Sequence, residues 1–433
     1  MGKAELVHGA RVTTAERRQV TWGSFDLESL VREDHRVRAI WQVIESLDLK
    51  AFYARISSVE ERAGRPATDP KILLALWIYA TSEGIGSAHH VDRLCKTDAV
   101  YRWICGGVSM NQHTLSDFRT DYRVEVDGLM TKVIATLMHN GLLHLRRLAH
   151  DGMRVRASAG AASFRRKQSL HSCAEEARAR IAELQKEIDE EPAASDTRRR
   201  KAQERAAKMR EEAIAQALEE LPLVEQAKER RATRDSKART RDPKAKKGVP
   251  RASTTDPEAR VMRMPDGGFR PAYNVQLATD TESRFIVGVD VTNVGSDAAL
   301  LTPMLDDIER RTGQLPKEHL VDGGFNALAE IERAHQRGVA VYAPKLASRS
   351  RKTKSTRRDP PGVAAWRARM DEPATKPIYK LRAATAETVN ADLRRWRGLD
   401  RFVVRGRHKV RACAVLSALT YNVLRWIELA PAA

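Results

Sequence analysis

Two aspartates, each followed directly by glycine, stand at the ends of two predicted strands. Asp151-Gly152 ends the segment that begins at Leu145, and Asp322-Gly323-Gly324 follows the apolar segment His319-Leu320-Val321. An acid at a strand end, beside a residue that lets the backbone turn sharply, can point into the crevice over the edge of a sheet. Two such carboxylates on neighbouring strands suit Mg²⁺, which prefers oxygen ligands and binds one or two carboxylates together with substrate phosphate. A single Asp-Gly pair is more often an ordinary turn, so this chemistry depends on the two pairs coming together.

A third acid, Glu387, lies on a predicted helix, with Arg394 seven residues later. At 3.6 residues per turn the two side chains share one helix face. A carboxylate for a metal and a cation for a phosphate on one face would suit a DNA backbone lying across the helix. Metals held by the three acids could clamp the attacking and leaving oxygens of a phosphodiester displacement. Other acids compete for these roles, namely Asp280, Asp290, Glu372 and Asp392.

Hydrophobic patterns indicate the elements that must position these acids. Residues 272–280 and 285–291 alternate between apolar and polar and are joined by four residues, which predicts a strand hairpin. Further strands are expected at 145–151, 319–322 and 339–343, and helices at 297–312 and 326–337. This order predicts an α/β fold, a mixed sheet with flanking helices. It matches the order of the RNase H-like nuclease fold, with a catalytic domain at 145–164 and 262–426.

An all-α domain is predicted before the sheet, over residues 25–144, with a tail at 1–24. Asp69 followed by Pro70 is a typical helix start, and the apolar run Ile72 to Ala80 follows it. Further helices are expected at 87–96, 97–105, 113–121 and 122–140. This domain is a candidate for DNA binding, in which His113 and Arg119 either contact DNA or serve packing.

An insert at 165–261 separates the first strand from the rest of the sheet. No Phe, Trp or Tyr occurs between Phe164 and Phe269, so a packed domain is not expected there. Residues 172–221, divided at Pro192, predict a helical hairpin or a loosely paired coil. Residues 226–251 carry eleven Lys and Arg against three acids, which predicts a flexible basic arm. Its Lys244, Lys246 and Lys247 are candidate DNA contacts.

The charge of the whole chain favours a polyanionic partner. The 433 residues include 76 Lys and Arg against 57 Asp and Glu, a net charge of +19. The longest apolar run is too short to span a membrane, and no secretory signal is recognisable. Four scattered cysteines form no CxxC pair, which argues against a disulfide framework or a zinc site and favours the cytoplasm. The basic loop before Glu387 adds three candidate DNA contacts, Arg351, Lys352 and Lys354.

Taken together, these motifs resemble the DDE-type transposases of bacterial insertion sequences. The chain resembles the subgroup of this family that has a Tyr…Arg…Glu…Lys signature around the last acid. Tyr379, Arg382, Glu387 and Arg394 fall on this signature. The resemblance covers roughly residues 24–426 and leaves 427–433 as a tail. Its other motifs are Gly64-Arg65-Pro66, Asp69-Pro70, Tyr101 with Trp103, His113 to Arg119, Asp151-Gly152, Val289 to Asn293 with Ser296-Asp297, Val321 to Phe325, and Arg397-Gly398-Leu399.

The resemblance implies an enzyme that cuts and rejoins DNA at the ends of its own element. Asp151, Asp322 and Glu387 would be the catalytic, metal-binding acids, with Mg²⁺ as cofactor and Mn²⁺ as a substitute. The implied partners are double-stranded DNA, both terminal inverted repeats and target, and a second copy that pairs two ends at the bacterial nucleoid. Tyr379, Arg382, Arg394 and Arg397 would contact DNA.

The signature departs from the family pattern at three points. Arg394 replaces the usual lysine, four residues rather than three separate Arg382 from Glu387, and Asn390 stands where many relatives have an aromatic or apolar residue. Two other functions share most of these features, a nuclease of the same fold that does not join strands and a DNA-binding protein derived from a transposase. The three acids in order disfavour the binding-only function, and strand joining separates the other two.

Overall fold

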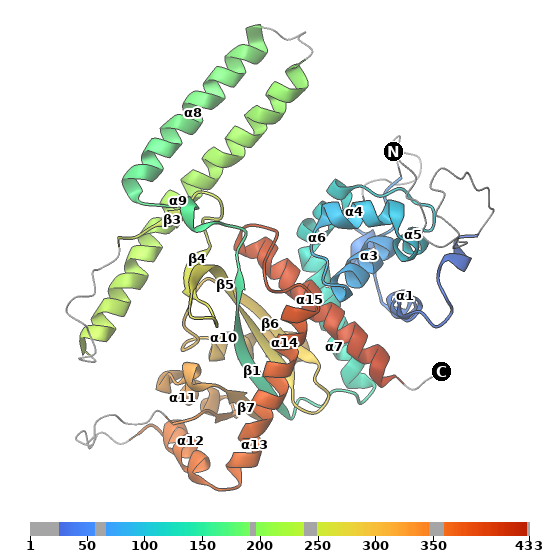
Figure 1. Ribbon diagram of the computed structural model, residues 1–433. Helices are drawn as coiled ribbons and strands as arrows, with labels where there is room; N and C mark the ends of the chain where they lie inside the picture. The colour runs from blue at the N-terminus through green and yellow to red at the C-terminus, as the bar shows by residue number, and fades with distance from the viewer. Residues whose placement is uncertain (1–25, 57–65, 191–195, 238–248, 346–358, 431–433) are drawn as a thin grey trace, which may run out of the picture.

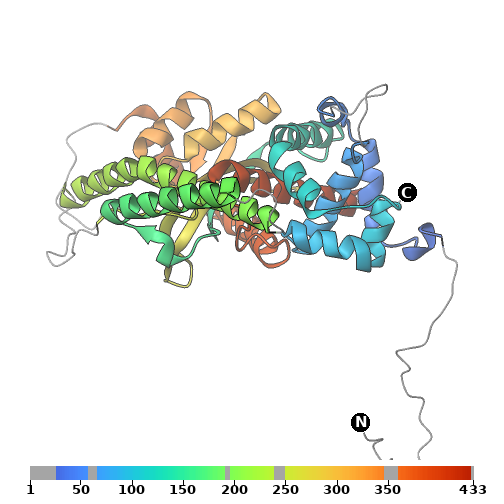
Figure 2. The same cartoon turned by 90° about the horizontal axis from the view of Figure 1, so that it is seen from above.

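The computed structural model describes residues 26–56, 66–190, 196–237, 249–345 and 359–430. A mixed α/β body lies at the centre, with a bundle of helices on one side and a long helical hairpin projecting away from the sheet (Figures 1 and 2). The predicted mixed α/β class is confirmed. No helix within the described ranges is long and apolar enough to cross a membrane.

The N-terminal part is helical, as predicted. Its helices are α1 (Arg36–Ser46), α2 (Lys50–Tyr53), α3 (Pro70–Ser82), α4 (Ala88–Thr97), α5 (Ala99–Cys105), α6 (Gln112–Asp121) and α7 (Arg123–His139), after a 3-10 turn η1 (Glu28–Leu30). Helix α3 begins where the sequence indicated, because the Asp69 carboxylate accepts a hydrogen bond from the Lys71 N–H at 2.8 Å. Residues 73–82 of α3 are all buried, so α3 is the central helix of this bundle.

Within the described residues the sheet has six strands, β1 (Arg147–Arg156), β4 (Arg260–Arg263), β5 (Phe269–Asp280), β6 (Ile286–Thr292), β7 (Glu318–Val321) and β8 (Ala340–Tyr342). Strand β1 is central, since it pairs antiparallel with β5 and parallel with β7. Strands β4 and β6 share the other edge of β5, and β8 extends β7 in parallel. The predicted strands are therefore present, and the sheet also contains β4, which is not predicted from the sequence.

Helices cover the sheet and connect it to the N-terminal bundle. They are α10 (Leu301–Thr312), α11 (Leu328–Gln336), α12 (Pro361–Asp371), α13 (Thr375–Arg382), α14 (Thr388–Arg395) and α15 (Arg407–Leu429), with a 3-10 turn η3 (Gly323–Phe325). Helix α15 covers the outer edge of β6, where the Asn422 amide bonds both the N–H and the carbonyl of Ile286 at 2.8 Å. These bonds satisfy backbone groups that an open sheet edge would leave unpaired.

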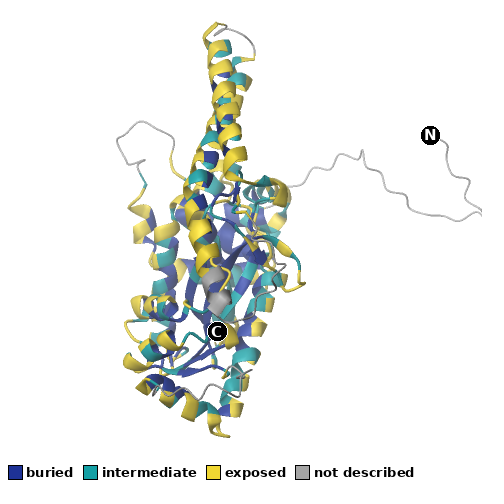
Figure 3. Cartoon of the chain, turned by 90° about the vertical axis from the view of Figure 1, so that its left-hand side faces the viewer, coloured by how far each residue is buried: buried dark blue, intermediate teal, exposed yellow. Residues whose placement is uncertain are grey.

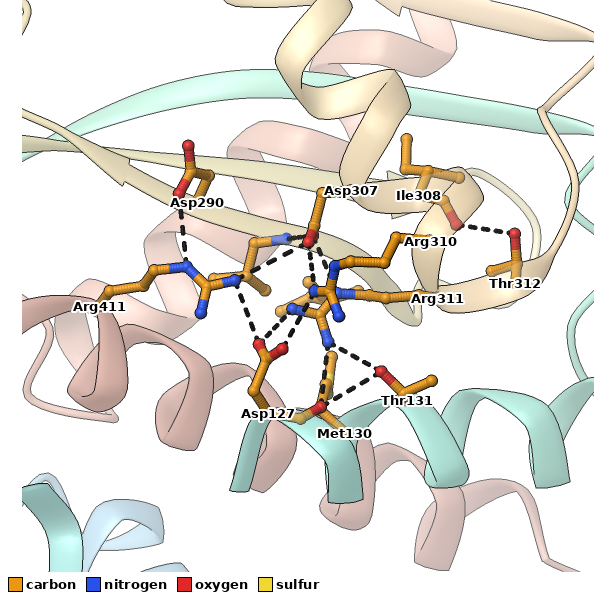
Figure 4. A network of polar contacts seen from close by, with 12 residues as sticks. Asp127, Met130, Thr131, Asp290, Asp307, Ile308, Arg310, Arg311, Thr312 and Arg411 are labelled. Atoms are coloured by element: carbon orange, nitrogen blue, oxygen red, sulfur yellow. Dashed lines mark hydrogen bonds and ion pairs between the residues drawn. The ribbon is translucent and has the colours of Figure 1, made fainter. Parts of the chain in front are cut away.

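A buried ion network joins the helical bundle to the sheet (Figure 4). The Arg311 side chain has no exposed surface, and it pairs with Asp127 of α7 at 2.6 Å and Asp307 of α10 at 2.9 Å. Arg411 of α15 also reaches Asp127 at 3.2 Å, and Asp290 of β6 at 3.4 Å. Because a buried guanidinium needs paired carboxylates, the network holds α7, α10, α15 and the sheet in one arrangement.

The insert forms a two-helix hairpin, α8 (Lys167–Glu190) and α9 (Thr197–Lys237), as predicted. At its base lie a 3-10 turn η2 (Ala161–Ser163) and two short paired strands, β2 (Phe164–Arg165) and β3 (Ala252–Ser253). Leu170, Ile214 and Leu221 are buried between the helices near this base, while most of the hairpin surface is exposed (Figure 3).

The prediction of a flexible arm beginning at residue 226 is wrong for its first part. Residues 226–237 are the last turns of α9, because they are rich in Ala, Glu, Lys and Arg, which favour helix. Residues 167–237 contain sixteen basic and sixteen acidic residues, so the excess positive charge of the insert lies outside the hairpin. Lys244, Lys246 and Lys247 lie outside the described residues, and so do Arg351, Lys352 and Lys354.

Candidate active site

Asp151 and Asp322 lie on neighbouring parallel strands. The register of β1 and β7 pairs His150 with Val321. Asp151 and Asp322 are the next residues along these two strands and therefore lie beside each other. Adjacent strands are about 4.8 Å apart, which brings both carboxylates to one face of the sheet. The Asp322 carboxylate also accepts a hydrogen bond from the Gly324 N–H at 2.7 Å, which fixes the turn after β7.

The prediction that the first strand ends at Asp151 is wrong. Strand β1 continues to Arg156, because β5 pairs with it along this whole length. Gly152 is therefore not a turn residue. A Cβ at this position would lie 2.7 Å from Asp297 Oδ1 and 2.9 Å from Asn274 Oδ1, and closer still to the Gln276 amide nitrogen. Glycine is required here because buried polar side chains lie against the backbone of β1 and leave no space for a Cβ.

These polar groups form a network on the opposite face of β1 from Asp151. The Asp297 carboxylate accepts hydrogen bonds from the side-chain amides of Asn274 at 2.7 Å and Gln276 at 2.9 Å. Its second oxygen pairs with Arg154 at 2.8 Å. From the sequence, Asp297 is predicted only as part of a family motif, and neither amide is among the predicted site residues. Amides two residues apart in an otherwise apolar strand were the available signal, because such residues share one face.

The third acid, Glu387, ends a π-helical turn, η4 (Ala383–Glu387), between α13 and α14. In a regular α-helix, residues five apart point about 140° away from each other. The wider turn instead brings Arg382 and Glu387 together, with Arg382 Nη2 3.1 Å from Glu387 Oε1. A π-turn absorbs one extra residue without changing the helices on either side. The fourth residue between Arg382 and Glu387 is accommodated in this way.

Arg382 connects this helix to the strands. Its Nη1 lies 3.9 Å from Asp151 Oδ2, so one guanidinium contacts both Asp151 and Glu387. Tyr379, one turn earlier, donates its hydroxyl hydrogen bond to the Val321 carbonyl at 3.2 Å, just before Asp322. The segment from Tyr379 to Glu387 is thereby held against Asp151 within β1 and against the end of β7.

The electrostatic environment of Asp151 favours a cation. Burial raises the pKa of the Asp151 carboxyl to about 6, with a further upward contribution from Asp322 and a lowering one from Arg382. Burial also raises the pKa of Tyr379, so its hydroxyl stays a neutral donor. An ionised Asp151 is thus short of compensating charge, which a bound cation would supply.

Comparison with known families identifies the chain. Residues 25–121 match a transposase domain (DUF772), and residues 237–423 match a transposase DDE domain. The chain belongs to the DDE transposases of insertion sequences. It is a metal-dependent polynucleotidyl transferase and endonuclease that acts on DNA in transposition. No curated protein and no solved structure matches it.

The matched ranges include Asp322 and Glu387 of the transposase but not Asp151. The assignment of Asp151 as a catalytic acid therefore depends on the geometry, because Asp151 lies beside Asp322 and contacts Arg382. Within the described ranges no three His, Cys, Asp or Glu side chains are gathered closely enough to hold a metal ion. The Arg382 side chain contacts both Asp151 and Glu387, and the Glu387 side chain is 64% exposed.

The competing acids in the strands have other partners in the transposase. Asp280 accepts a hydrogen bond from the Ser283 N–H at 2.7 Å and so caps the turn between β5 and β6. Asp290 pairs with Arg411 in the network between the bundle and the sheet. Neither carboxylate contacts Asp151 or Asp322 in these bonds, so neither takes part in the arrangement around Arg382.

The competing acids near α14 are also set apart. Asp392 pairs with Arg397 at 3.0 Å, and Glu372 is exposed at the end of α12. Arg397 donates its remaining bond to the Ser82 carbonyl at 2.7 Å, which joins the α14 end to the helical bundle. This predicted DNA contact therefore has intramolecular partners. Arg394, on the Glu387 helix, is only partly buried, with one bond at 3.4 Å to the Arg154 carbonyl.

Arg119, left open between DNA contact and packing, is buried in the helical bundle. Its guanidinium lies 4.2 Å from the centroid of the Trp77 ring and donates to the Gly86 carbonyl. It is 7% exposed, which is the burial of a packing residue. His113 is exposed on α6, so a surface role remains open to it.

Proposed function

We propose that Asp151, Asp322 and Glu387 are the catalytic acids of this transposase and hold Mg²⁺, or Mn²⁺ in its place, in an RNase H-like domain. The strand order β6-β5-β1-β7-β8 supports this fold. The first three strands are antiparallel, and β7 and β8 run parallel to β1. The domain would comprise 145–164 and 262–426, beside the helical DNA-binding domain at 25–144 and the insert at 165–261.

The observation that carries the proposal is the position of Arg382. Its guanidinium contacts Asp151 and Glu387 together, while Asp151 lies beside Asp322 on the neighbouring strand. Two acids that are far apart in the sequence therefore contact one cation, and the third follows the strand beside one of them. The donor set fits a divalent metal, since it is made of carboxylates with a raised Asp151 pKa and no competing soft ligand among them.

The residues suggest how DNA would be held. A bound divalent cation lowers the pKa of water and stabilises the charge that develops on the phosphate. Arg382 would exchange the two carboxylates for a DNA phosphate, which its planar fork binds through two parallel hydrogen bonds. Arg394 would contact the same backbone from the next turns of the helix. Tyr379 would keep its bond to the Val321 carbonyl and so hold the helix at the end of β7.

The substrates would be the terminal inverted repeats of the element and a target duplex, brought together by a homodimer at the bacterial nucleoid. The test is an assay with element-end DNA and Mg²⁺ or Mn²⁺, which follows release of a 3′-hydroxyl and its joining to target DNA. We expect both steps. Cleavage without joining would show a nuclease of this fold, and binding without cleavage would show a DNA-binding protein.

A further inference from the structure

Asn390 makes a direct contact with the proposed catalytic carboxylate of Asp151. Its side-chain Nδ2 donates a hydrogen bond to Asp151 Oδ2 at 3.1 Å, from α14 to β1. The other carboxylate oxygen accepts from the Gly152 N–H at 2.9 Å. Asn390 lies three residues after Glu387, so the two side chains are close on the face of α14 that meets the strand.

We infer that Asn390 is a positioning residue, which holds the Asp151 carboxylate in one orientation for metal binding. This inference rests on the proposed function of the same site. Carboxylates that bind metals are themselves held by hydrogen bonds, and removing such a partner lowers metal affinity or activity. The Asn390 amide has this role in the present chain.

A neutral donor suits this position better than a charged one. Arg382 lies 3.9 Å from the same Asp151 oxygen, and its positive charge opposes the approach of a divalent cation. When Arg382 turns to a phosphate, Asn390 still holds Oδ2. The amide therefore orients the carboxylate in both states and adds no repulsion.

Packing fixes Asn390 in this place. Val389 and Leu393 of α14 are fully buried, so the helix cannot rotate about its axis. The π-turn before α14 sets the angle at which Glu387 and Asn390 leave the helix. Side chains that orient a site are effective when their own helix is locked in this way.

The test measures Mn²⁺ binding to the full-length protein by electron paramagnetic resonance, with Mn²⁺ alone as the probe. Asn390→Leu keeps the side-chain size and removes the donor, and we expect affinity to fall by roughly 10- to 100-fold. Thr388→Val is the matched control, since Thr388 is exposed on the same helix and, among the described residues, its hydroxyl bonds to the Ala384 carbonyl. Its Mn²⁺ affinity should not change, and both variants should unfold at the temperature of the unchanged protein.

Asp151→Asn separates failure of this inference from failure of the proposed site. If Asp151→Asn weakens Mn²⁺ binding and Asn390→Leu does not, the positioning role of Asn390 is refuted and the site stands. If Asp151→Asn binds Mn²⁺ as tightly as the unchanged protein, or the unchanged protein binds none, the proposed metal site is wrong and this inference falls with it.

Discussion

Replacing Gly152 with alanine should destabilise the protein through the polar network on the far face of β1. The new Cβ would lie within 2.9 Å of Asp297, Asn274 and Gln276, all of which are buried and cannot swing into water. Overpacking a core costs about 1–3 kcal/mol, and a hydrogen bond broken at a buried group costs about 1–3 kcal/mol more. We therefore expect the free energy of unfolding to fall by roughly 2–6 kcal/mol.

Urea unfolding of Gly152→Ala, followed by circular dichroism, measures this loss. Gly128→Ala is the matched control, because Gly128 lies within α7 and a Cβ there meets nothing within 4 Å. Alanine in a helix interior is favoured over glycine by about 0.5–1 kcal/mol, so the control should be unchanged or slightly more stable. Equal stability of the two variants would refute the close approach at Gly152 and the network built on it.

Three further predictions concern the Asp151 carboxyl, the π-turn and the ion network between the helical bundle and the sheet. The Asp151 pKa is about 6 in the fold against an ordinary 3.8, so its stabilising contribution is present below pH 4 and lost as pH rises through 6. From pH 4 to pH 7 the unfolding free energy of the metal-free protein should fall by about 2 kcal/mol more than that of Asp151→Asn. Deleting Ala384 removes the extra residue of the π-turn and should keep cleavage within about tenfold, whereas deleting Ala391 turns the end of α14 by about 100° and should abolish cleavage. Asp127→Ala leaves the Arg311 side chain, which has no exposed surface, short of one partner, and should lower stability by about 3 kcal/mol in thermal or urea unfolding. The first prediction is contradicted if Asp151→Asn has the same pH dependence as the unchanged protein. The second is contradicted if the two deletions have the same effect on cleavage, and the third if Asp127→Ala is as stable as the unchanged protein.

Local patterns were enough to predict most elements of the fold. Asp69-Pro70 placed the start of α3, because an N-cap carboxylate and a proline at the first helical position act within a few residues. Alternation over 272–280 and 285–291 placed β5 and β6 for the same local reason. The segment 226–237 was misread, because its charge suggested an arm while its good helix formers continued α9.

The contacts around the site could not be predicted, because they join residues that are distant in the sequence. Gly152 was interpreted as a turn residue, and only the approach of Asp297 across β1 explains it. The extra residue after Arg382 was interpreted as a departure from the family signature, and the π-turn explains it. Asn390 had no explanation in the sequence, since its partner Asp151 lies 239 positions away.

The central claim is that Asp151, Asp322 and Glu387 act together in one metal-dependent site. The most direct measurement is Mg²⁺-dependent cleavage of element-end DNA by Asp151→Asn, Asp322→Asn and Glu387→Gln, each with DNA binding measured in parallel. We predict that all three lose cleavage and keep DNA binding, while a Glu372→Gln control, at an exposed acid directly after α12, cleaves normally. Full cleavage by any of the three variants would contradict the assignment.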